Sequence, residues 1–219
     1  MTDPQFTFWR SPQWARYCAA HGGPTTDNNS PDNIVVPLGP DVSMLGAMRR
    51  DHRVTINRMH GLALTICEWP GSFAFRQYQH LHELDAGRKT RPQETFDIMD
   101  SWLGTNGLLL LASVVGQAQP IGAAYFILDR PGAYYASAAR MPGVKGPIHH
   151  YLIWSAMQML ALRGYQYLDL GHPETPAIHE FKRGFIKEGR GGISWPSAVG
   201  GAERRGGSSP SPSAEVASG

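Results

Sequence analysis

The feature of the sequence that most constrains the fold is a strand–helix–strand unit in the C-terminal half. Residues 147–162 have the apolar content and the length of a helix, and Arg163-Gly164 ends it. Residues 165–170 are typical of a buried strand, which ends at Gly171 before a short loop. A second helix then carries Phe-Lys-Arg-Gly-Phe at 181–185. A strand that leads into a basic helix is suited to holding an anion.

Three strands come directly before the helix at 147–162, and turn residues join them; the last of the three is the first strand of the unit. They are predicted at 108–115, 119–128 and 133–139, with turns at Gly116-Gln-Ala118 and Asp129-Arg-Pro-Gly132. Short connections of this kind give an antiparallel meander. We therefore predict an α/β (α+β) fold with a mixed, mostly antiparallel sheet flanked by helices on both sides. The strands at 133–139 and 165–170 should lie in the same sheet.

The N-terminal half alternates between short strands and helices. Strands are predicted at 34–38 and 62–67, and helices at 43–60, at 72–84 and from Pro92 to about residue 103. In the helix at 72–84 we expect Phe73, Leu81 and Leu84 near the inner face, with Phe75 or Arg76 beside them. In the next helix, Phe96, Met99 and Leu103 recur at helical spacing.

The predicted organisation is one folded domain with a segment on either side of it. Residues 1–40 form an N-terminal helix and loop, 41–196 form the domain, and 197–219 form a tail rich in Ser, Gly and Ala. The tail lacks an apolar pattern, so we expect it to be disordered and dispensable for folding.

Composition excludes some classes of protein. The net charge of +2 is too small to indicate nucleic-acid binding by itself, although 16 of the 20 basic residues are Arg. Cys18 and Cys67 have no metal-binding or redox spacing, so both are predicted to be free thiols. No leader peptide and no membrane span is recognisable, and the expected location is the cytoplasm.

The loop from Arg140 to Gly146 is a candidate anion site, because it joins a strand to a helix. Gly143 and Gly146 would let the backbone approach a phosphate, free N–H groups at the helix start favour an anion, and Lys145 could add a charge. An ordinary glycine-proline turn is the alternative.

Candidate catalytic residues lie on the strand and helix that follow. Lys182 could bind a phosphate or stabilise an oxyanion, with Arg183 next to it, or both could be solvated charges. Asp169 faces away from its two neighbouring leucines and could orient an amine or act as a base, or cap a turn. Of Tyr134 and Tyr135, which alternate across a strand, one should face the core; Tyr135 is the predicted site residue.

Other charged groups are weaker candidates. Arg49, Arg50, Arg53 and Arg58 form a basic stripe that could grip phosphates or could be a solvated face. The histidines at 149, 150 and 179 have no supporting carboxylates, so no metal site is predicted.

Several short sequence motifs together resemble those of a known family. Four motifs are similar to those of the FemABX-like branch of the GNAT acyltransferase superfamily. They lie at 147–154, 164–171 and 181–185, and at 49–53 with the sequence Arg-Arg-Asp-His-Arg. This branch includes the peptidoglycan-bridge aminoacyltransferases, which carry two such domains. The resemblance covers about residues 40–188 and implies a GNAT-like core.

The resemblance also implies an activity. The expected reaction transfers an acyl or aminoacyl group to an amine, in cell-envelope or polysaccharide biosynthesis. Acyl-CoA or aminoacyl-tRNA would be the co-substrate, without a tightly bound cofactor. The acceptor would be a small-molecule or peptidoglycan-precursor-like amine, and tRNA a possible partner.

The resemblance also implies roles for particular residues. It favours Lys182 as catalytic and Arg140, Gly143, Lys145 and Gly146 as donor-binding. Asp169 and Tyr135 are further catalytic candidates from their strand positions, and Arg183 is a further donor-binding candidate. The GNAT donor loop has the pattern Arg/Gln-x-x-Gly-x-Gly/Ala, and here the second glycine comes one residue late. A non-catalytic GNAT-like module that binds a nucleotide or a protein is the alternative function.

Overall fold

The computed structural model describes residues 34–130, 132–171 and 175–186. The predicted N-terminal helix and the predicted tail at 197–219 lie outside these residues, as does Cys18.

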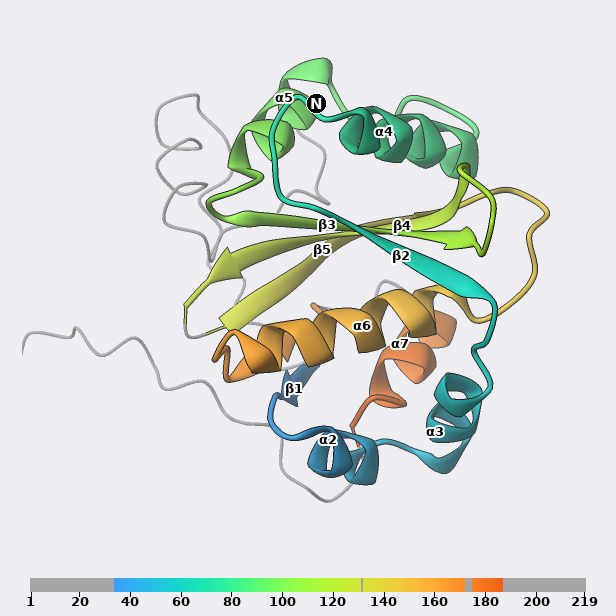
Figure 1. Cartoon of the computed structure of the whole chain (residues 1–219), viewed down its shortest axis with the longest axis vertical. Coiled ribbons are helices and arrows are strands. Elements are labelled where there is room, and N and C mark those ends of the chain that lie inside the picture. The colour runs from blue at the N-terminus through green and yellow to red at the C-terminus, as the bar shows by residue number, and fades with distance from the viewer. Residues whose placement is uncertain (1–33, 131, 172–174, 187–219) are drawn as a thin grey trace, which may run out of the picture.

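A six-stranded sheet forms the middle layer of the described structure (Figure 1). Its strands lie in the order β1-β6-β5-β4-β3-β2. Their bounds are β1 Val35–Pro37, β2 Leu62–Cys67, β3 Gly107–Val114, β4 Pro120–Asp129, β5 Gly132–Arg140 and β6 Tyr167–Asp169. All neighbours are antiparallel except β5 and β6, which are parallel. The predicted mixed sheet, with 133–139 and 165–170 side by side, is confirmed.

Helices cover both faces of the sheet, as the sequence predicts. In Figure 1, α4 and α5 lie above the sheet and α6 and α7 below it, with α2 and α3 at the lower end of the protein. Their bounds are α2 Asp41–Ala47, α3 Arg50–Asn57, α4 Phe73–Ala86, α5 Gln93–Trp102, α6 Ile148–Leu162 and α7 Pro176–Arg183. This arrangement produces two cores, one on each face.

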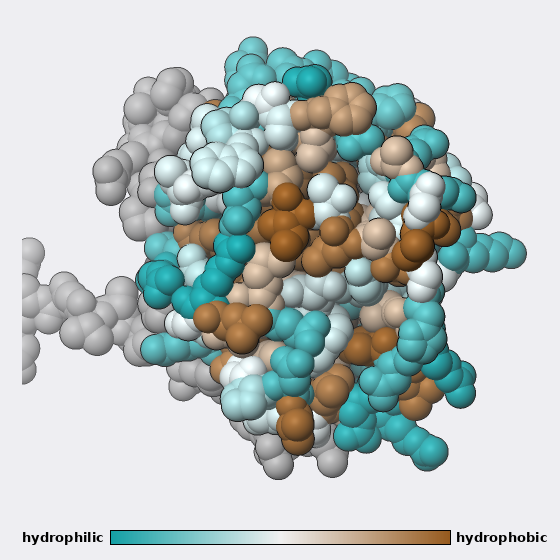
Figure 2. All heavy atoms as spheres, in the orientation of Figure 1, coloured by the Kyte–Doolittle hydropathy of each residue, from teal (hydrophilic) through white to brown (hydrophobic). Residues whose placement is uncertain are grey.

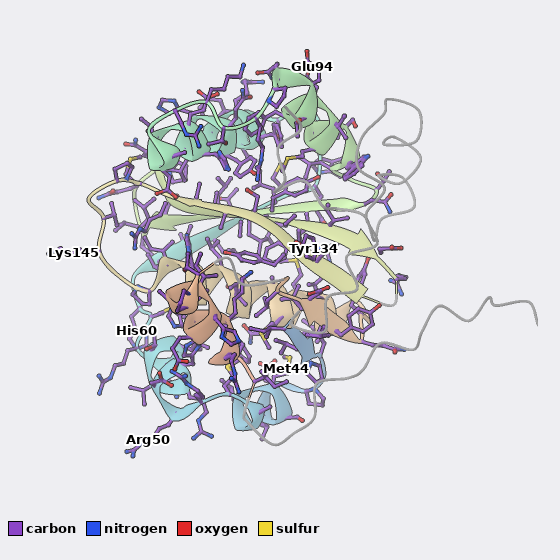
Figure 3. The ribbon with its side chains drawn as sticks, turned by 180° about the vertical axis from the view of Figure 1, so that it is seen from behind. Met44, Arg50, His60, Glu94, Tyr134 and Lys145 are labelled. Atoms are coloured by element: carbon purple, nitrogen blue, oxygen red, sulfur yellow. The ribbon has the colours of Figure 1, made fainter. Side chains whose placement is uncertain are left out.

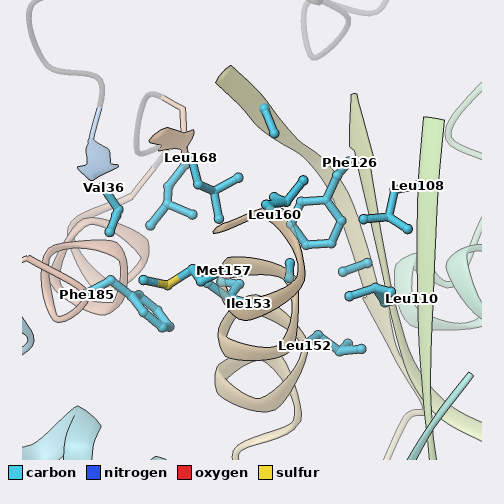
Figure 4. Close-up of a cluster of buried hydrophobic side chains, with 14 of the residues drawn as sticks. Val36, Leu108, Leu110, Phe126, Leu152, Ile153, Met157, Leu160, Leu168 and Phe185 are labelled. Atoms are coloured by element: carbon cyan, nitrogen blue, oxygen red, sulfur yellow. The ribbon is translucent and has the colours of Figure 1, made fainter. Parts of the chain in front are cut away.

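The larger core lies between the sheet and α6. This helix buries residues on several sides, because the sheet covers one side of it while α3 and α7 cover others. Figure 4 shows its side chains between those of the strands and Phe185. The buried contributors from α6 are Ile148, Leu152, Ile153, Ala156, Met157 and Leu160.

The second core lies between the sheet and α4 with α5. Phe96, Met99 and Leu103, which recur at helical spacing in the sequence, are all buried in this core. The prediction for Phe73 and Leu84 is wrong, because both side chains are exposed. Ser72 is the N-cap of α4, and the helix that begins there turns a different set of residues toward the core. These buried residues are Phe75, Tyr78, Leu81 and His82.

The single helix predicted at 43–60 is also wrong, because the chain forms α2 and α3 with a break at Met48 and Arg49. The break has a tertiary cause. The backbone N–H of Arg49 donates to the carbonyl of Gly184, 3.0 Å away, and the Arg49 side chain binds Glu180 on α7. An N–H that bonds another segment cannot continue an intrahelical ladder.

The outer edge of the sheet at β2 exposes apolar side chains. Figure 2 shows hydrophobic atoms gathered over this strand on the face turned to the viewer. Ile66 is 47% exposed, and Val115, which follows β3, is 62% exposed. None of the described helices has both the length and the apolar content that a membrane span requires.

Candidate functional site

The candidate site begins where β5 and β6 part. The two strands pair over only three residues each, from Gly132 opposite Tyr167 to Tyr134 opposite Asp169. Beyond Tyr134, β5 continues to Arg140 and pairs only with β4 among the described strands. This stretch therefore presents an open edge. The N–H of Met141 donates to Ile121 of β4, whereas the N–H of Arg140 donates to Asp85 of α4, away from β4. Because N–H groups point to alternate sides along a strand, the N–H of Ala138 points the same way as that of Arg140, toward the open edge.

A β-bulge lies within the open stretch. Tyr125 of β4 is opposite Ser137, and the next residue, Phe126, is opposite Tyr135, so Ala136 is an extra residue in β5. A bulge bends its strand and increases the local twist. Here it comes two residues after the last pair with β6, at the place where β5 must turn away from that strand.

Asp169 lies at the parting point and is almost completely buried. Its Oδ1 accepts a hydrogen bond from the N–H of Gly171, 2.8 Å away, so the carboxylate closes the turn after β6. Gly171 has a φ of +74°, which favours glycine, and a Cβ there would be 2.9 Å from the Tyr134 hydroxyl. Asp169 is opposite Tyr134 in the register, and both side chains lie on the α4 face.

Tyr135, the predicted site tyrosine, lies on the opposite face of β5. Its ring packs on Phe126 in the core around α6, with ring centroids 5.5 Å apart, and burial raises its pKa. The structure thus brings Tyr134, and not Tyr135, beside Asp169 and Gly171. Alternation in the sequence limits the choice to one of the two tyrosines, and only packing decides which.

The glycine-containing loop leads from the end of β5 into α6. Gly143 and Gly146 both have positive φ, at +78° and +131°, and a Cβ at either would meet nothing within 4 Å. Lys145 is exposed on the outer side of this loop (Figure 3). The N-cap of α6 is Pro147, which provides no side-chain cap. The first N–H groups of α6 are thus left without a side-chain acceptor from their own N-cap.

The C-terminal end of α7 lies beside the first turn of α6. The ring of His150 is 4.9 Å from that of Phe181 and 5.9 Å from that of Phe185, centroid to centroid. His52 of α3 packs on the same rings and is 4.4 Å from His150. Phe185 is fully buried and Phe181 packs against the same core, so both rings attach α7 to α3 and α6.

Lys182 and Arg183 are consequently carried to the region of the glycine loop. Both lie in the last turn of α7, are half-buried and follow Phe181 directly. The helix ends at Arg183 with Gly184 as its C-cap, before Phe185. Cations in a last turn also interact favourably with the helix dipole. The packing of Phe181 on His150 thus brings the last turn of α7, which carries Lys182 and Arg183, to the first turn of α6.

Burial sets the protonation of the histidines in this region. Desolvation lowers the pKa of His52, and it lowers the pKa of His150 to about 4, with the neighbouring histidines adding to the effect. His149, at the loop side of α6, also has a lowered pKa, chiefly from burial. All three rings are therefore neutral at pH 7. Among the described residues, no group of three His, Cys, Asp or Glu side chains could hold a metal ion.

The basic stripe is divided by the break between α2 and α3. Arg49 forms ion pairs with Asp51 and Glu180, and its guanidinium lowers the pKa of Asp51 to about 2. Arg50 and Arg58 are exposed, and Figure 3 shows Arg50 pointing outward. Only part of the predicted stripe is thus presented to solvent, because Arg49 is used to attach α7.

Sequence reasoning missed Arg91, which is 5% exposed next to the bulge of β5. Its Nη1 donates to the hydroxyls of Tyr78 and Ser137. No local pattern distinguishes it from the other arginines. Cys67 is a buried free thiol, as predicted.

Comparison with known proteins adds information on the fold. No family profile and no curated protein matches the sequence. Among solved structures, FemX matches with a TM-score of 0.60 and 12% identity, over 80% of this chain and 65% of FemX. L-PGS from Bacillus licheniformis matches with a TM-score of 0.48 and 12% identity, over 64% of this chain and 44% of that one. A tandem GNAT protein from the clavulanic acid biosynthesis pathway matches with 0.45 and 15%, over 80% and 55%.

These likenesses concern the fold, because all three identities are at most 15%. The chain spans less than two thirds of the length of each of these proteins. The chain has a FemX-like fold.

Proposed function

We propose that the protein transfers an acyl or aminoacyl group from an activated donor to an amine. The observation that carries this proposal is the continuous path from the open edge of β5, through the glycine loop, to the start of α6 beside the cations of α7. A donor that has a reactive carbonyl at one end and phosphates at the other fits this path. Both acyl-CoA and aminoacyl-tRNA have that construction.

The phosphates of the donor would lie at the start of α6. Gly143 and Gly146 leave room for them, and the unoccupied space around both glycines supports a close approach of the backbone. Arg140, Lys145 and Arg183 would add charge-assisted hydrogen bonds. The N–H groups of the first helical turn, which lack a side-chain cap, would supply further donors.

The reacting carbonyl would lie along the open edge of β5. The neutral acceptor amine attacks the carbonyl carbon and forms a tetrahedral intermediate, whose oxyanion is stabilised by N–H groups of β5 and by Lys182. Asp169 orients the amine or accepts its proton. The intermediate then collapses, the carbon–sulfur or carbon–oxygen bond to the donor breaks, and the leaving thiolate or ribose oxygen takes a proton. Tyr134, in place of Tyr135, is the proposed proton donor, because its hydroxyl lies beside Gly171 at the parting point.

The acceptor follows from the resemblance to FemABX-like enzymes more than from the geometry. A small-molecule or peptidoglycan-precursor-like amine, used in cell-envelope or polysaccharide biosynthesis, is the proposed class. Arg50 and Arg58 are exposed and would suit the phosphates of tRNA or of a nucleotide-linked acceptor.

A second candidate function is a non-catalytic module that binds a nucleotide or a protein. One observation favours it, namely that Asp169 is 1% exposed and already holds the N–H of Gly171. A carboxylate used to close a turn is less available as a base.

Incubation of the purified chain with labelled acetyl-CoA and, separately, with charged tRNA would separate the two functions. Transfer of label to an amine supports the enzyme, and binding of a donor without transfer supports the module. Lys145→Ala should weaken donor binding about 10-fold or more, since a charge-assisted hydrogen bond contributes roughly 1.5–3 kcal/mol. Lys89→Ala, an equally exposed lysine in the link between α4 and α5, is the matched control. Equal binding by both variants would contradict the placement of the phosphates.

A further inference from the structure

Three polar side chains from three segments meet behind the bulge of β5. The Tyr78 hydroxyl, on α4, donates to Ser137 Oγ at 2.9 Å. Arg91 Nη1, from the link between α4 and α5, donates to the same oxygen at 2.9 Å and to the Tyr78 hydroxyl at 3.2 Å. We call these three residues the bulge clamp. All three side chains are buried, so water cannot easily replace these bonds.

The bulge explains why Ser137 is available to the clamp. In a regular strand Ala136 and Ser137 would point to opposite faces. Here the extra residue interrupts the alternation, and both side chains face α4: Ala136 packs in the core on that side, and Ser137 bonds Tyr78. The clamp is therefore attached to the bulge itself. Slippage of the register that removed the bulge would turn Ser137 away from Tyr78 and Arg91.

The clamp is fixed on its other side by aromatic packing. The Tyr78 ring is fully buried and stacks against Tyr125 of β4, with centroids 6.2 Å apart. Phe75 and Phe96 pack around the same ring at 5.5 and 6.2 Å. The hydroxyl of Tyr78 thus has a fixed position, and Arg91 completes the triangle from a second segment.

From this geometry we infer that Arg91 is a positioning residue. Through Ser137 it holds the bulge of β5, and the bulge orients the open edge of β5 so that its backbone faces the acyl carbonyl of the donor. The bulge lies between the last pair with β6 and the stretch in which the N–H of Ala138 is turned toward the open edge. Loss of the clamp would allow β5 to straighten and would misalign these groups. This inference rests on the proposed transfer reaction for its catalytic consequence.

The primary test is Ser137→Ala, which detaches the clamp from β5 without removing a buried cation. Amide hydrogen exchange at Ala136 and Ser137 should become about 10-fold faster or more, since local opening governs exchange. In transfer assays kcat should fall about 10-fold or more while KM for the donor changes less than about 3-fold, as expected for misaligned transition-state contacts. Arg91→Lys, which retains one donor, should restore part of the kcat lost in Arg91→Met.

Ser113→Ala is the matched control, because Ser113 is an equally buried serine beside the other bulge, between β3 and β4. It should leave exchange at Ala136 and the kcat unchanged. Unaltered exchange in Ser137→Ala, or equal kcat losses in the two serine variants, would overturn the inference. A wild-type chain that transfers from neither donor would contradict the proposed function, and the exchange result would still decide whether the clamp holds the bulge.

Discussion

Gly184→Ala is expected to destabilise the protein for a reason that is visible only in the tertiary structure. Gly184 has a φ of −63° and a ψ of −21°, which alanine adopts readily, so the backbone does not oppose the change. The obstacle is His52. A Cβ on Gly184 would lie 1.9 Å from His52 Nε2 and 2.2 Å from its Cε1, far inside van der Waals contact.

The cost follows from how tightly His52 is held. Its ring is 4% exposed and is enclosed by His150, Phe181 and Phe185, at centroid distances of 4.4, 5.8 and 4.8 Å. The ring cannot rotate away without displacing a neighbour, so α7 must move instead. Overpacking of this kind costs about 1–3 kcal/mol. Because α7 carries Lys182, the change should also lower the transfer rate.

Urea denaturation of Gly184→Ala should give a free energy of unfolding about 1–3 kcal/mol below wild type. Gly46→Ala is the matched control: this glycine lies in α2 with nothing within 4 Å, so the same change should be neutral or stabilise by up to about 1 kcal/mol. In a double-mutant cycle with His52→Ala, the penalty of Gly184→Ala should largely vanish. A stable Gly184→Ala variant, or a penalty unchanged in the cycle, would refute the proposed contact.

Three further outcomes are expected. Lys182→Ala should lower the transfer rate roughly 10²–10³-fold, as expected for loss of an oxyanion contact; Arg183→Ala, about 100° around the helix, should instead raise KM for the donor with little change in kcat, and equal small effects of both changes on kcat would mean that Lys182 is only a surface charge. The free energy of unfolding, followed by urea titration, should decrease as pH falls from about 6.5 toward 4. The reason is that burial lowers the pKa of His52 and of His150, the latter to about 4, so the unfolded chain binds protons more readily; a flat profile would contradict this. Ser72→Ala should cost about 1 kcal/mol in thermal unfolding, because the Ser72 side chain accepts the bond from Phe75 N that caps α4, and no loss would show that the cap is dispensable.

Much of the fold could be predicted because its signals are local. Turn residues at 116–118 and 129–132 fix the meander, and each predicted strand bound there lies within two residues of the observed one. The helix predicted at 147–162 begins one residue later, and it ends where predicted. Two local interpretations failed where other segments intervene, namely the unbroken helix at 43–60 and the inner face of the helix at 72–84.

The candidate site was predictable only in part. The loop at 140–146 and the basic pair Lys182-Arg183 are recognisable by composition and by resemblance, but their proximity arises from the packing of Phe181 on His150. Arg91 gave no signal, because an arginine before a helix is ordinarily exposed. It is buried beside Ser137, next to the bulge at Ala136, and the bulge belongs to the register between β5 and β4.

The sequence by itself determined the order of elements, the mixed sheet and the segments that carry charge and glycine, because periodicity and turn chemistry act over a few residues. Only the tertiary structure decided which tyrosine of the pair at 134 and 135 meets Asp169. It also decided that Arg49 breaks a helix to hold α7, and that α7 ends beside the start of α6. These outcomes depend on contacts between residues far apart in the chain, and local propensity carries no information about such contacts.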